Sequence, residues 1–143
     1  MVANNLLKSI LNLLGGNTSS IGSAPYLALS TTRPNADGTG VTEPTGYGYE
    51  RTLLGGSGDT NYMGQPTEVS GKFTMTNTKE IHFNEATGTW GTIGYFALFT
   101  SKTGGTMYYS GELTSTISPV EGTVVVIKVG ELSISLSAEE LSA

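Results

Sequence analysis

Short runs of alternating apolar and polar residues fill most of the chain from residue 26 to residue 136. A period of two places apolar side chains on one face of a β-strand, and the Gly, Pro, Asn and Asp residues between the runs are typical of turns. This pattern predicts strands over Tyr26–Thr31, Tyr47–Leu54, Thr92–Thr100, Met107–Leu113 and Thr123–Val129. Two further strands are expected between residues 69 and 92, one with Phe73 and Met75 and the next with Ile81 and Phe83. A last strand carries Leu132, Ile134 and Leu136. About seven to eight such strands predict an all-β fold, an antiparallel β-sandwich or jelly-roll.

Composition agrees with a turn-rich β protein that has one core. The 143 residues include 20 Gly, and only 13% are charged, which is about half of the usual share. A chain of this length has the usual size of a single domain. The run Thr92–Thr100 carries apolar side chains on both faces, so we expect it to form a central strand.

The first residues follow a helical period instead. Apolar residues at i, i+1, i+4, i+7 and i+8 predict a short amphipathic helix over residues 4–14, with an apolar face made of Leu6, Leu7, Ile10, Leu13 and Leu14. Asn4 or Asn5 can cap its start, and Gly15 with Gly16 ends it. Because a helix of about three turns is marginal alone in water, this face must dock either on the domain's own sheet or on a neighbouring subunit.

Two parts of the chain follow from this pattern. We expect a helix with a flexible polar tether over residues 1–24 and a β-sandwich domain over residues 25–143. The helical run is far shorter than the roughly 20 apolar residues of a membrane span, and no basic segment precedes it, so we expect a soluble protein with no membrane partner and no secretory signal. The net charge of −5 and the scattered Lys and Arg residues argue against a nucleic-acid partner.

Side chains that support catalysis or metal binding do not gather in the sequence. The chain has no Cys, and its only histidine, His82, is out of phase with its apolar neighbours and should face solvent. Asp37 and Asp59 lie in glycine turns, which explains both without a two-carboxylate mechanism. Residues 35–38 are only part of a calcium loop, and the glycines lack the spacing of a phosphate loop. We therefore expect no enzyme, no metal site and no cofactor.

Aromatic residues on or near loops are candidates for recognition. Such rings stack on sugars or anchor protein interfaces. The candidates are Tyr47, Tyr49, Tyr62, Trp90 and Tyr108. The alternative for Trp90 is that it fills one end of the sandwich core.

Several blocks of the sequence resemble, in order, a family of small virion proteins of tailed bacteriophages that are commonly labelled phage tail fibre proteins. The blocks are Leu29–Pro34, Asp37–Gly46, Tyr49–Arg51, Ile81–Phe83, Ala86–Gly91, Ile93–Phe99, Gly104–Gly105 and Val129–Leu136. The likeness covers roughly residues 25 to 136 and leaves the helix aside. It implies a non-enzymatic β-sandwich on a phage particle, with no catalytic motif.

The resemblance and the helix together predict a structural component of a tailed-phage virion, of tail fibre or capsid decoration type. Its expected partners are other virion proteins and further copies of itself, and its apolar helix face would be the anchor. The main alternative is a receptor-binding module that recognises host surface glycan through the aromatic residues. A glycan depolymerase is a third reading, and no constellation of residues supports it. Position in the particle and copy number stay open.

Overall fold

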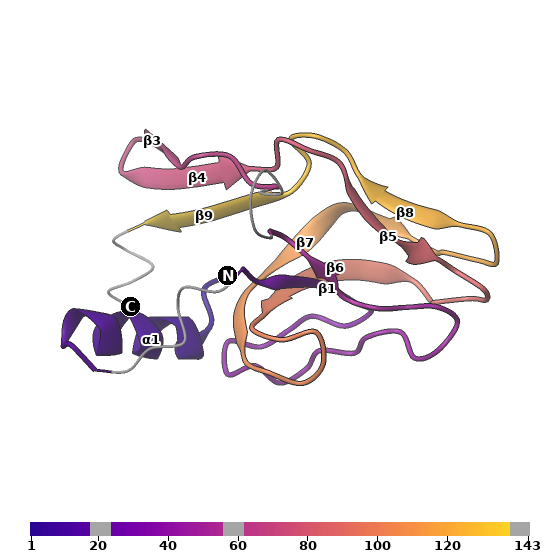
Figure 1. Ribbon diagram of the computed structural model, residues 1–143, viewed down its shortest axis with the longest axis horizontal. Helices are drawn as coiled ribbons and strands as arrows, with labels where there is room; N and C mark the ends of the chain where they lie inside the picture. Colours follow the sequence, from indigo (N-terminus) through magenta and orange to yellow (C-terminus); the bar gives the residue numbers. More distant parts are fainter. Residues whose placement is uncertain (18–23, 56–61, 138–143) are drawn as a thin grey trace.

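The computed structural model describes residues 1–17, 24–55 and 62–137. These residues form one helix and nine strands in three antiparallel sheets (Figure 1). The elements are α1 (Asn4–Leu14), β1 (Tyr26–Ser30), β2 (Thr52–Leu53), β3 (Thr67–Val69), β4 (Lys72–Thr76), β5 (Ile81–Glu85), β6 (Ile93–Phe99), β7 (Met107–Ile117), β8 (Val124–Ile127) and β9 (Ser133–Ser137). The predicted all-β sandwich with a short N-terminal helix is confirmed.

The largest sheet has the strand order β2-β1-β6-β7. Its central strand β6 pairs with β1 on one side and β7 on the other, and six of its seven residues are buried. The prediction of a central strand over this segment is therefore confirmed. The other two sheets, β3-β4-β9 and β5-β8, lie across from it and supply the second layer (Figure 1).

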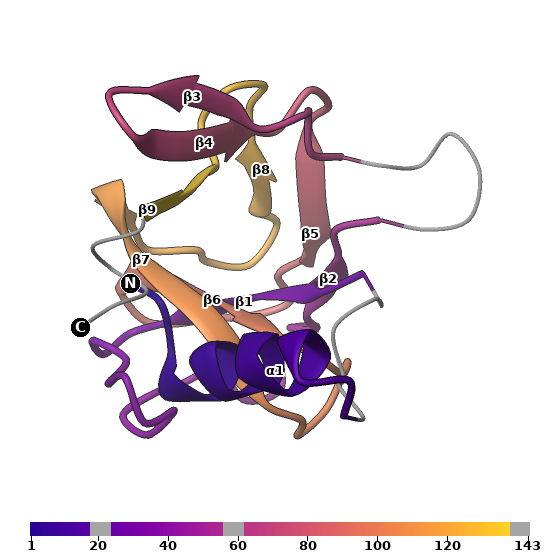
Figure 2. The ribbon, with the colours of Figure 1, turned by 90° about the vertical axis from the view of Figure 1, so that its left-hand side faces the viewer.

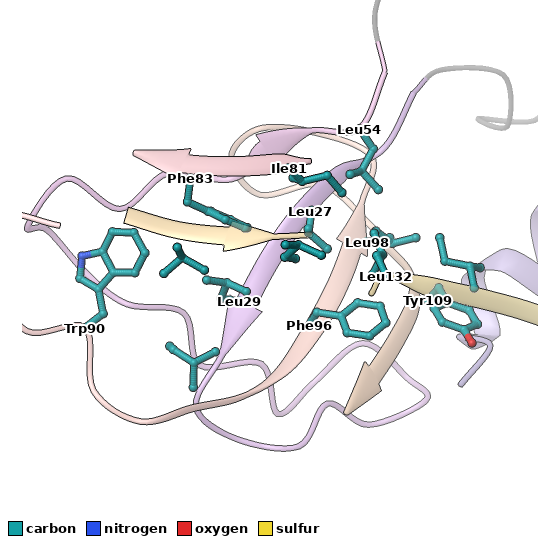
Figure 3. Packing of buried hydrophobic residues seen from close by; sticks show 14 of the residues in the cluster. Leu27, Leu29, Leu54, Ile81, Phe83, Trp90, Phe96, Leu98, Tyr109 and Leu132 are labelled. Carbon is teal, nitrogen blue, oxygen red and sulfur yellow. The ribbon is translucent and has the colours of Figure 1, made fainter. Parts of the chain in front are cut away.

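The core lies between these layers and draws side chains from all three sheets (Figure 3). Period-two alternation explains which residues enter it, since Ile81 and Phe83 of β5 are buried while His82 between them is exposed. Other buried members of the core are Leu27, Leu29, Leu54, Trp90, Ile93, Phe96, Leu98, Tyr109, Ile127, Leu132 and Ile134.

The structure differs from the predicted strands in two places. Tyr47–Leu54 was expected to be one strand, but only Thr52–Leu53 pairs, because Gly46, Tyr47 and Gly48 all have positive φ and form a turn. After residue 66 the structure has a hairpin, β3 and β4, joined by Ser70 and Gly71 at φ 54 and 80. The strand β3 escaped prediction because all three of its residues are exposed and show no apolar alternation.

The expected tether and its neighbourhood lie largely outside the described residues, as does Asp59. The division into a helix with tether and a β-domain stays a prediction for that reason. Among the residues that the structure describes, no helix is long and apolar enough to cross a membrane.

Candidate assembly surface

Main-chain pairing with β7 fixes the start of the chain. Val2 forms an antiparallel bridge with Tyr109, the Ala3 N–H donates to the Tyr108 carbonyl at 3.0 Å, and the Ser110 N–H donates to the Met1 carbonyl at 2.9 Å. The first three residues thus extend the large sheet beyond β7. This pairing holds α1 on the outer side of the molecule, in front of β6 and β7 (Figure 2).

The helix begins without the predicted asparagine cap. Ala3, which is fully buried, is the N-cap residue, and no side chain accepts a hydrogen bond from the first turn. The Asn4 N–H donates instead to the Ala36 carbonyl of a neighbouring loop at 2.8 Å. A tertiary contact therefore replaces the side-chain cap. The C-terminal end follows the prediction, since Gly15 is the C-cap and Gly16 has φ 75.

The docked side of α1 is partly polar, and much of its apolar face is open. Ser9 Oγ lies 3.4 Å from Tyr108 Oη on β7, within hydrogen-bond reach. No residue of α1 is fully buried; of the predicted face, Leu6, Leu7 and Ile10 are half-buried, whereas Leu13 and Leu14 are exposed. Leu11 and Leu14 keep 69% and 78% of their surface exposed. Amphipathic surface helices normally turn such residues inward.

Leu11 was missing from the face predicted from the sequence. Leu7, Leu11 and Leu14 stand at i, i+4 and i+7, so they form one row along the helix, which we call the leucine strip. Lys8, three residues before Leu11, lies beside this row and is exposed. The i, i+4 spacing from Leu7 was the signal in the sequence that could have identified Leu11.

A groove of about 680 Å³ lies between β7 and β8 and reaches the core. Its apolar floor and walls consist of Leu29, Phe96, Leu113, Ile117, Val125, Ile127 and Leu132. Glu112 and Glu131 also line it. Over this stretch, within the described residues, β7 pairs only with β6 and β8 pairs only with β5, so each turns an unpaired edge outward. We call this feature the β7–β8 groove.

A partly buried ion pair holds the loop that runs from β1 to β2. Arg51 donates to both carboxylate oxygens of Glu43, from Nε at 2.9 Å and from a terminal nitrogen at 2.7 Å. Its other terminal nitrogen donates to the Ser101 carbonyl at 2.8 Å and the Gly104 carbonyl at 2.6 Å. The guanidinium also stacks over Phe99, 3.8 Å from the ring centre. The side chain of Arg51 is only 7% exposed and that of Glu43 is 23% exposed, so this clamp joins three segments with little contact to solvent.

Tyr49 completes the clamp. Its hydroxyl donates to Glu43 Oε1 at 2.7 Å and accepts from the Leu29 N–H at 3.0 Å. Burial and the Glu43 carboxylate raise the pKa of Tyr49 far above its ordinary value. Burial by itself would raise the pKa of Glu43, but the hydrogen bonds from Arg51 and Tyr49 outweigh it and hold that pKa below the ordinary 4.5.

The five aromatic recognition candidates do not form one open platform. Trp90 is 3% exposed and closes one end of the core (Figure 3), and its Nε1–H donates to the Tyr47 carbonyl at 2.9 Å. Tyr49 packs edge-on against Trp90 with ring centres 5.3 Å apart. Tyr62 is half-buried against the core, Tyr108 lies under α1, and Tyr47 alone of the five is exposed. Glycan recognition through these residues stays a prediction.

The family comparison concerns the whole of this architecture, helix included. A family model described as podophage GP4 fiber I protein gp80 matches residues 1–135. The chain belongs to this family. The fibre protein is therefore a structural, tail-fibre type component of a phage virion, as the resemblance implied. A comparison with curated proteins gives no match.

The family match extends beyond the resemblance found in the sequence. It begins at residue 1, so α1 and the β7-paired residues before it are part of what the fibre protein shares with its family. The resemblance had covered only the β-domain. A segment that belongs to the family pattern, and whose Leu11 and Leu14 nonetheless face solvent, is the strongest candidate for a contact surface.

Polar side chains of the fibre protein outside this surface have local explanations. His82 Nε2 lies 3.7 Å from Glu80 Oε1 in an exposed pair. Asp37 accepts hydrogen bonds from the Thr39 hydroxyl at 2.6 Å and the Thr39 N–H at 2.9 Å, which lower its pKa and close an Asx turn. Among the described residues, no three His, Cys, Asp or Glu side chains gather closely enough to hold a metal ion.

Proposed function

We propose that the fibre protein is a structural subunit that joins the virion by protein–protein contacts, with the leucine strip of α1 as its anchor. The observation that carries this proposal is the exposure of Leu11 and Leu14 on a helix that the family model includes. Large apolar side chains grouped on a surface mark interaction sites. Other virion proteins, including further copies of the chain, are the partners of this surface.

The fold supports such a role in two ways. The pairing of residues 1–3 with β7 and the docking of Ser9 on Tyr108 hold α1 in place, so a partner would meet a helix already formed. Pre-organisation lowers the entropic cost of binding. Leu11 and Leu14 also lie on the side of α1 opposite Ser9, away from β7, where a partner can reach them.

A double substitution, Leu11→Lys with Leu14→Lys, tests the anchor. Each buried leucine contributes about 1.5 kcal/mol or more to an interface, and about 1.4 kcal/mol corresponds to a tenfold change in affinity. We expect at least about a tenfold loss of fibre protein from particles grown with this variant. Quantitative mass spectrometry of purified virions measures the number of copies per particle.

The matched control is Val69→Lys with Phe73→Lys on the β3–β4 hairpin, where both residues are exposed. This pair adds the same charge and removes comparable apolar surface away from α1, and we expect normal incorporation. Lys and Leu have similar helix propensities, so circular dichroism should show an intact helix in the α1 variant. Incorporation of a folded α1 variant at the wild-type level would refute the anchor.

A further inference from the structure

We propose that copies of the fibre protein associate head to tail, with the leucine strip of one copy seated in the β7–β8 groove of the next. This inference rests on the proposed function, because it takes the strip as a contact surface and assigns its occupant. The chain exposes a ridge of leucines at one place and a groove with an apolar floor at another. The ridge of one copy can therefore fill the groove of another copy.

The dimensions of the groove suit side chains rather than a whole domain. Its volume of about 680 Å³ falls within the range of pockets that enclose a small organic ligand, so it can take several leucine side chains. Leu113, Ile117, Val125 and Ile127 offer aliphatic walls of the same chemistry as the strip. The exposed Val124 on its rim would be covered in the same contact.

Charge favours the same pairing. Lys8 is the only charged residue of α1, whereas Glu112 and Glu131 line the groove. Glu112 pairs with Arg33 at 3.4 Å in an exposed contact, and Glu131 accepts a hydrogen bond from the Lys128 N–H at 3.0 Å. Among the described residues, Glu131 forms no ion pair, so Lys8 of a neighbouring copy would meet an uncompensated carboxylate. In a chain of net charge −5, this contact brings opposite signs together.

The strip and the groove lie at opposite ends of β7. The helix packs near Tyr108 and Ser110, while the groove is lined by β7 residues from Glu112 onward and by β8. Figure 1 shows α1 at one end of the molecule and β8 at the other. One copy therefore does not fill its own groove with its own strip. A contact between two different patches is heterologous, and it builds a ring or an open filament.

Complementation between two variants tests this geometry. The strip variant is Leu11→Lys with Leu14→Lys, and the groove variant is Thr114→Lys with Val124→Lys, which places positive charge at two exposed lining positions. In sedimentation velocity on the full chain, we expect the wild type to form concentration-dependent oligomers and each variant alone to stay monomeric. An equimolar mixture should form a one-to-one dimer and nothing larger, because each dimer has only one intact contact.

Other outcomes overturn the proposal. A groove variant that self-associates like the wild type, a mixture that stays monomeric, or a wild type that is monomeric at every concentration each rules out head-to-tail contact. The last result would instead favour an extended strand of another virion protein at the free edges of β7 and β8. The anchor is tested separately, by incorporation into virions. If the strip variant is lost from virions and the groove variant is incorporated normally, the anchor is supported and the head-to-tail contact is ruled out.

Discussion

Glu43→Ala is expected to destabilise the fibre protein by about 3 kcal/mol, which corresponds to a fall in Tm of roughly 10 °C for a chain of this size. The substitution leaves the Arg51 guanidinium, whose side chain is only 7% exposed, without its bidentate partner. Arg51 keeps its bonds to the Ser101 and Gly104 carbonyls, yet its charge stays buried and unpaired. Thermal unfolding followed by circular dichroism measures the effect.

Glu50→Ala is the matched control, because Glu50 pairs with Lys102 at 3.0 Å on the surface, where both side chains are more than half exposed. Exposed pairs contribute about 0–1 kcal/mol, so the fall in Tm should be small. Equal effects of the two substitutions would contradict the clamp.

Acid should weaken the same clamp. The pKa of Glu43 in the folded chain is held below its ordinary value of 4.5, so its carboxylate stabilises the fold at pH values above 4.5. That contribution is lost as the pH falls from 4.5 through the lower folded pKa. Glu43→Gln, which cannot titrate, should show a smaller loss of Tm between neutral and acid pH than the wild type.

Trp90→Ala is expected to lower the free energy of unfolding by about 3–5 kcal/mol, as large-to-small changes of a buried aromatic residue do. The indole is 3% exposed at the end of the core, it touches the edge of Tyr49, and its N–H satisfies the Tyr47 carbonyl. Denaturant unfolding gives the free energy of unfolding of the variant.

Comparison with Trp90→Phe and Tyr47→Ala separates the core role from a recognition role. Phe at position 90 keeps much of the packing and loses the hydrogen bond, so the free energy of unfolding of Trp90→Phe should fall between those of the wild type and Trp90→Ala. Tyr47→Ala removes an exposed ring and should lower the free energy of unfolding least. If Trp90→Ala kept full stability and lost glycan binding, Trp90 would be a recognition residue, contrary to its buried position.

Alternation predicted the fold where strands have one or both faces in the core. The segment Thr92–Thr100 was expected to form a central strand, and β6 lies within it; the serine–apolar alternation of Ser133–Ser137 marks β9. Alternation gave the wrong strand at Tyr47–Leu54, where positive φ at Gly46, Tyr47 and Gly48 turns the chain. It failed also at β3, whose exposed residues leave no apolar pattern to read. Local sequence carries little information where strand pairing alone decides the structure.

The candidate surface was predicted only in part. The helix and most of its apolar residues followed from the period of 3.6, but its orientation depends on Val2 pairing with Tyr109 and on Ser9 meeting Tyr108, about 100 residues apart in the chain. The β7–β8 groove likewise includes Leu29 and Phe96 from distant parts of the chain, and the clamp links Arg51 to the Ser101 and Gly104 carbonyls, about 50 residues away. No window of residues could have revealed either.

A cryo-electron microscopy map of the intact particle, at a resolution that traces side chains, tests the anchor most directly. We expect the fibre protein with Leu11 and Leu14 covered by density from another protein chain. A map in which the fibre protein is ordered, its α1 helix stands free in solvent, and contacts to the particle come only from other surfaces would contradict the central claim.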